Sequence, residues 1–100
     1  MLRHVVMFSW NETVDAAHVQ TVSQQLDALR ALIPEIVGYQ HGPDAGISSG
    51  NFDYVVVGDF KNVDDYVVYR DHPDHKAFIA TYIAGRLNSR SAVQYELRPN

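Results

Sequence analysis

The chain has 100 residues, of which 46% are hydrophobic and 20% are charged, and its formal net charge is −4. This length and balance predict one globular domain over residues 1–100, with a single core. The acidic balance argues against nucleic-acid binding, which needs a basic surface, and the absence of cysteine excludes disulfides, thiolate nucleophiles and zinc–thiolate sites.

A first strand is predicted over Leu2–Trp10, which is rich in valine and aromatic residues. Apolar side chains fall on both of its faces, so both faces should be covered. Thr13 is then expected to cap a helix that Pro34 ends. The apolar residues of this helix recur at steps of three and four: Val19, Val22, Leu26, Leu29 and Ile33.

Two further extended segments follow the first helix. Residues 36–40 form the first of them, closed by Gly42 and Pro43. A polar, glycine-rich loop then leads to a strand over Phe52–Phe60, in which apolar residues recur at every second position.

The C-terminal third is predicted to hold two helices and a last strand. Asn62 should cap a short helix over Val63–Arg70. Pro73 interrupts it, and a longer helix should run to about Asn88. Its buried stripe is predicted to comprise Phe78, Ile79, Tyr82, Ile83 and Leu87. Residues 93–97 alternate as a final strand.

The element order predicts an α+β fold of the ferredoxin-like βαββαβ type, a four-stranded antiparallel sheet with helices on one face. Helices on one face leave the other face uncovered. We assign a largely apolar set to that open face: His4, Val6, Phe8, Trp10, Tyr54, Val56 and Phe60. Because an exposed apolar face of this size usually meets a partner, we expect a homodimer through it, forming a dimeric α+β barrel with a cavity on each side.

The stretch from Tyr69 to His75 concentrates the chemistry of the chain. Pro73 should end one helix near Asp71 and begin the next, with His72 or Asp71 as cap and His75 in the first turn. A neutral His75 could accept a proton while the Tyr69 phenol holds a carbonyl oxygen or orients the base. Tyrosine and histidine also fill joints between helices in purely structural roles, and the spacing alone leaves that alternative open.

Several segments together resemble the stress-responsive α/β-barrel family, also described as dimeric α+β barrel proteins. They are Leu2–Phe8, Ala31–Pro34 with Val37–Tyr39, Asp53–Val57 with Asp59–Phe60, and above all His72-Pro73-Asp74-His75. The similarity spans nearly the full length.

This resemblance implies a small-molecule pocket and, from the family's olivetolic acid cyclase, an intramolecular aldol condensation of a β-polyketide thioester. By its match to that cyclase, His75 would be the catalytic base and Tyr69 its partner, and His4 would line the substrate pocket. We expect Tyr54 and His72 to line the same pocket. Tyr54 stands where the cyclase has a histidine, which changes the polarity of the pocket. No cofactor and no metal are implied.

Other functions fit the same residues. The first alternative is a non-enzymatic, stress-associated oligomer or ligand-binding protein. Others are a cofactor-free monooxygenase, which would share the fold but not these residues, and a metal site at His72 and His75, which Pro73 disfavours by breaking the helix register. We expect a cytoplasmic protein without a membrane partner, because no signal-peptide pattern or apolar run of ~18 residues is present.

Overall fold

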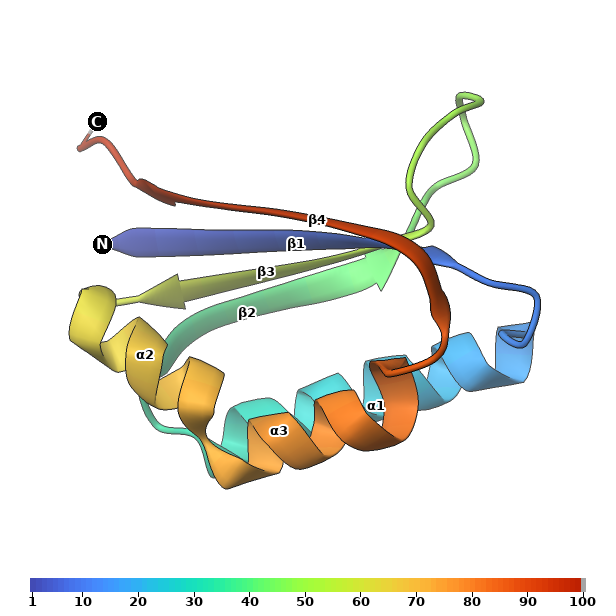
Figure 1. Ribbon diagram of the computed structural model, residues 1–100. Coiled ribbons are helices and arrows are strands. Elements are labelled where there is room, and N and C mark those ends of the chain that lie inside the picture. The colour runs from blue at the N-terminus through green and yellow to red at the C-terminus, as the bar shows by residue number, and fades with distance from the viewer. Residues whose placement is uncertain (100) are drawn as a thin grey trace.

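In the computed structural model, which describes residues 1–99, four strands form one antiparallel sheet in the order β2-β3-β1-β4. The strands are β1 (Leu2–Trp10), β2 (Ile36–Pro43), β3 (Tyr54–Phe60) and β4 (Leu87–Glu96). The helices lie together on one face of this sheet, and β4 forms one of its edges (Figure 1). The predicted ferredoxin-like arrangement is confirmed.

Helix α1 spans Ala16–Leu32 and begins later than predicted. Asp15, not Thr13, is its N-cap, since an Asp15 carboxylate oxygen accepts a hydrogen bond from the His18 backbone N–H at 2.8 Å. The Thr13 hydroxyl instead donates to the Asn11 side chain at 2.6 Å. Both Thr and Asp are good N-caps, but the Thr13 side chain is hydrogen-bonded to Asn11 in a local turn and does not cap the helix.

Pro73 separates α2 (Val63–Asp71) from α3 (Pro73–Phe78), as predicted. The Asn62 cap is confirmed by a hydrogen bond from the Asp65 backbone N–H at 2.9 Å. His72 caps α3, with its Nδ1 accepting from the Asp74 N–H at 3.1 Å. Because proline offers no N–H and fixes φ, it fits the first position of the new helix and ends the old one.

The predicted last helix ends earlier than Asn88. After α3 the chain makes a π-helical segment, Ile79–Ile83, closed by a hydrogen bond from the Ala84 N–H to the Ile79 carbonyl at 2.8 Å. Gly85 follows at φ +76°, a left-handed conformation that ends the helix. Leu87 therefore lies at the start of β4 rather than on a helix stripe, and β4 is longer than the predicted 93–97.

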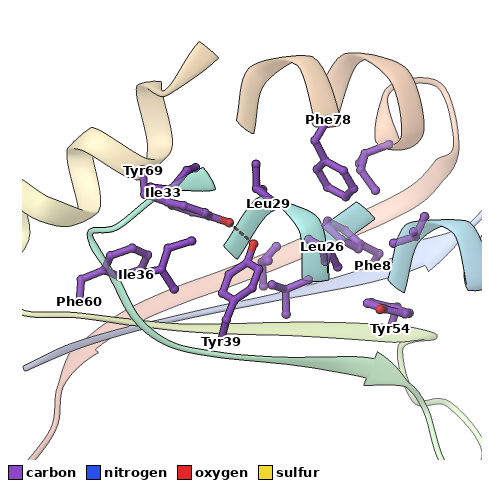
Figure 2. Close-up of a cluster of buried hydrophobic side chains, with 14 residues drawn as sticks. Phe8, Leu26, Leu29, Ile33, Ile36, Tyr39, Tyr54, Phe60, Tyr69 and Phe78 are labelled. Atoms are coloured by element: carbon purple, nitrogen blue, oxygen red, sulfur yellow. Dashed lines mark hydrogen bonds between the residues drawn. The ribbon is translucent and has the colours of Figure 1, made fainter. Parts of the chain in front are cut away.

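The assignment of the two sheet faces is also wrong. The seven residues placed on the open face turn toward the helices; six of them are buried, and Trp10 packs against the same core. Strand β1 is apolar on both faces, so alternation separates two sets of residues without showing which set meets the helices. Phe8, Tyr54 and Phe60 lie in the core with α1 residues such as Leu26 (Figure 2).

The uncovered face carries the other set of strand residues. It presents Val5 and Met7 of β1, Val55 and Val57 of β3, and Val93 of β4. Val5, Met7, Val55 and Val57 are half-buried, and Val93 is 55% exposed. An apolar open face therefore exists, formed by different residues from those predicted.

Candidate active site

A cavity of about 380 Å³ lies between the sheet and the helices. Its apolar wall comes from the strands, α1, α3, the π-helical segment and the turn that follows it: Val6, Phe8, Leu26, Val56, Phe78, Ile79, Ile83, Ala84, Gly85 and Leu87. Its polar groups are His4, Tyr66, Tyr69, Arg70, His75 and Arg90. An apolar hollow with a few polar groups is the usual form of a small-molecule site.

His75 is held by the helix joint. Its Nδ1 lies 3.0 Å from the backbone carbonyl of Arg70, in the last turn of α2. That carbonyl has no partner within α2 because the helix ends at Asp71, so the imidazole satisfies it. A carbonyl can only accept, and the proton of a neutral His75 must therefore sit on Nδ1.

The other ring nitrogen of His75 is consequently a free acceptor. Its Nε2 makes no hydrogen bond within residues 1–99, where every side-chain nitrogen or oxygen closed off from solvent has a partner. This atom therefore contacts open space, and His75 lines the cavity. Burial, with a smaller contribution from His72, lowers the pKa of His75 and favours the neutral form.

Tyr69 lies beside His75, with the two ring centroids 4.2 Å apart. Its side chain is buried, and its hydroxyl lies 2.7 Å from the hydroxyl of Tyr39 on β2 (Figure 2). Burial raises the pKa of Tyr69 to about 12 and raises that of Tyr39 further. Both phenols are therefore neutral near pH 7, and one donates to the other.

His4 supplies a second imidazole, at the β1 side of the cavity. The Gln94 side-chain nitrogen, which can only donate, lies 2.7 Å from His4 Nδ1, so a neutral His4 carries its proton on Nε2. Burial and the positive charge of Arg90 lower the pKa of His4 to about 4. The cavity thus holds one imidazole with an acceptor Nε2 and one with a donor Nε2–H.

Of the five residues predicted for the site, His75, Tyr69 and His4 line this cavity, whereas Tyr54 and His72 are not among its lining residues. The Tyr54 hydroxyl is hydrogen-bonded to Ser23 Oγ at 2.8 Å and to His41 Nδ1 at 2.9 Å. The imidazole of His72 caps α3, a local role that its position before proline favours.

Sequence reasoning missed four groups at or behind the cavity: Tyr39, Tyr66, Gln94 and Arg90. Tyr66 lies one helical turn before Tyr69, which could have indicated a shared face. Tyr39, Gln94 and Arg90 come from β2 and β4, whose register against the rest of the sheet no local pattern reveals.

Within residues 1–99 no cluster of three or more acidic, histidine or cysteine side chains could hold a metal ion. No helix in this part of the chain is long and apolar enough to cross a membrane.

The model of the stress-responsive A/B barrel domain family matches residues 2–97 of this chain. A dimeric ferredoxin-like protein of unknown function from Thermobifida fusca is 44% identical, with 96% of this chain and 90% of that chain covered and a TM-score of 0.89. A dimeric protein of unknown function from Bacteroides fragilis is 27% identical, with 96% and 95% covered and a TM-score of 0.79.

A hydroxynitrile lyase from Passiflora edulis is 16% identical, with 99% and 94% covered and a TM-score of 0.84. At that identity the likeness shows the shared fold and carries no chemistry to this chain. Among curated protein sequences, none matches this chain.

Proposed function

The chain belongs to the stress-responsive A/B barrel domain family, and we propose that its cavity is the active site of an acid–base enzyme acting on a small carbonyl compound. The observation that carries this proposal is the Nε2 atom of His75, an unpaired acceptor on a neutral imidazole whose side chain lines an apolar hollow. A general base needs this protonation state and this access to substrate.

The reaction that suits this arrangement is a polyketide-cyclase-like aldol closure of a short β-polyketide thioester. His75 Nε2 removes a proton from a carbon between two carbonyls, and the electron pair forms a bond to a ketone carbon further along the chain. The new alkoxide then takes the proton back from the imidazolium. The Arg70 carbonyl, which accepts from Nδ1, stabilises that imidazolium while it exists.

The enolate oxygen needs a donor during proton removal, and two groups serve. His4 offers its Nε2–H from the opposite wall. If Tyr39 donates to Tyr69, the Tyr69 hydroxyl proton is free to donate as well, beside the base. Burial strengthens both interactions because the apolar wall lowers the local dielectric.

Short β-polyketide thioesters incubated with the protein test this proposal, with cyclised product quantified by chromatography. His75→Gln should reduce turnover by roughly 100-fold or more, since it removes the base. His72→Asn is the matched control: it removes a neighbouring imidazole outside the cavity but keeps a side chain able to cap α3, so turnover should persist. Equal turnover by wild type and His75→Gln would contradict the role of His75.

The second candidate is a non-enzymatic ligand-binding or stress-associated oligomer. The observation in its favour is that the Tyr69 hydroxyl is already satisfied by Tyr39, as in a packed structural joint. This candidate predicts no turnover of any thioester, together with a large fall in melting temperature for His75→Gln.

We keep cytoplasmic localisation as a prediction.

We also infer a homodimer through the open sheet face. That face is apolar at Val5, Met7, Val55, Val57 and Val93, and the 44% identical Thermobifida fusca protein is dimeric. An uncovered apolar face on so small a chain favours a second copy as its cover. Val57→Lys should convert a dimer to a monomer in sedimentation, whereas Val63→Lys, at an exposed valine of α2, should not.

A further inference from the structure

Arg90 lines the cavity and has no side-chain partner among residues 1–99. It lies on β4, paired in register with Phe8 of β1, and makes no hydrogen bond or ion pair within residues 1–99. Arg3 and Arg70, in contrast, each make a two-pronged contact with a carboxylate, Asp59 and Asp71 respectively. The Arg90 guanidinium is therefore available to a ligand.

No aspartate or glutamate is among the residues that line the cavity. Its two histidines are neutral near pH 7, and the charge of Arg70 is offset by Asp71. The uncompensated charge at the cavity is thus the one positive charge of Arg90. This charge also acts on His4, because the positive charge of Arg90 contributes to lowering the pKa of that imidazole.

The geometry points to a ligand that is a small aromatic or alicyclic carboxylate, with its carboxylate on Arg90 and its apolar ring between Phe8, Leu26 and Ile83. This inference rests on the proposed function, since it names the class of molecule that occupies the same site. The planar guanidinium fork matches a carboxylate with two parallel hydrogen bonds. A cavity of about 380 Å³ is at the small end of ligand pockets, which suits a single- or fused-ring body.

Binding of a matched pair of probes, 2-naphthoate and its neutral isostere 2-naphthamide, tests this inference by calorimetry at pH 7 and low salt. Wild type should bind the carboxylate at least about tenfold more tightly, the scale of one charge-assisted contact near solvent. Arg90→Gln should abolish that preference, and Arg90→Lys should keep part of it. Arg98→Gln, the same charge change at an exposed position outside the cavity, should leave it intact.

Each outcome supports or overturns the carboxylate site, and some also bear on the proposed function. Equal binding of both probes, or a preference for naphthoate that survives Arg90→Gln, overturns the carboxylate site and leaves the cavity as a ligand site. Failure of both probes to bind overturns the carboxylate site and also counts against the proposed function. Naphthoate preference without thioester turnover supports the carboxylate site while the catalytic role of His75 fails.

Discussion

Acidification should destabilise the protein through His4, whose imidazole is only 5% exposed. Burial lowers its pKa from 6.5 to about 4, so the folded chain binds this proton less readily than the unfolded chain. The free energy of unfolding is therefore highest above pH 6.5, where His4 is neutral in both states, and it decreases as the pH falls toward 4. At about 1.4 kcal/mol per pH unit, the loss is roughly 2 kcal/mol by pH 5 and roughly 3 kcal/mol by pH 4.

Urea unfolding at a fixed protein concentration, repeated from pH 7 to pH 4, measures this loss. His4→Asn keeps a side-chain oxygen that can accept from Gln94 but cannot titrate, so its stability should fall less steeply. Wild type should lose about 2 kcal/mol more than the variant between pH 7 and pH 5. Parallel curves for the two proteins, or a wild type that gains stability on acidification relative to the variant, would refute the buried neutral state of His4.

Three further sets of substitutions test other parts of the structure by urea unfolding at pH 7. Tyr39→Phe leaves the buried Tyr69 hydroxyl without its partner and should lower the free energy of unfolding by about 1–2 kcal/mol. The double variant Tyr39→Phe/Tyr69→Phe should lose less than the sum of the two single losses. Additive losses would contradict the hydrogen bond between the two hydroxyls. Asp15→Ala should lower stability by about 1 kcal/mol and Thr13→Ala by less, because Asp15 caps α1; the reverse order would restore Thr13 as the cap. Gly85→Ala should lower the free energy of unfolding by about 1 kcal/mol or more, because a side chain is strained at φ +76°. A neutral or stabilising effect would contradict that backbone conformation.

The fold was predictable from the sequence because its signals are local. Pro73 separated two helices, Asn62 and His72 capped them, and alternating valines marked β1 and β3. The helix end at Gly85 was missed because the stripe from Phe78 to Leu87 continues in helical register through a π-helical turn and into a strand. The two sheet faces were exchanged because β1 is apolar on both.

The candidate site was predictable only in the parts that lie close together in the sequence. Tyr69 and His75 face the same cavity because one helix joint positions both. Tyr39, Gln94 and Arg90 reach that cavity or its residues through strand pairing between distant segments, which no spacing rule encodes. Tyr54 does not line this cavity, and its hydroxyl hydrogen-bonds Ser23 and His41 instead, two partners that no sequence spacing indicates.

The protonation of His75 is the measurement closest to the central claim. Long-range nitrogen–proton NMR of the labelled protein, titrated from pH 8 to pH 5, reports which ring nitrogen carries the proton and the pKa of the ring. We expect a neutral ring at pH 7 with the proton on Nδ1, a pKa below 6.5, and an Nε2 signal that moves when 2-naphthoate binds. An imidazolium at pH 7, or a proton on Nε2, would contradict the account of His75 as the base.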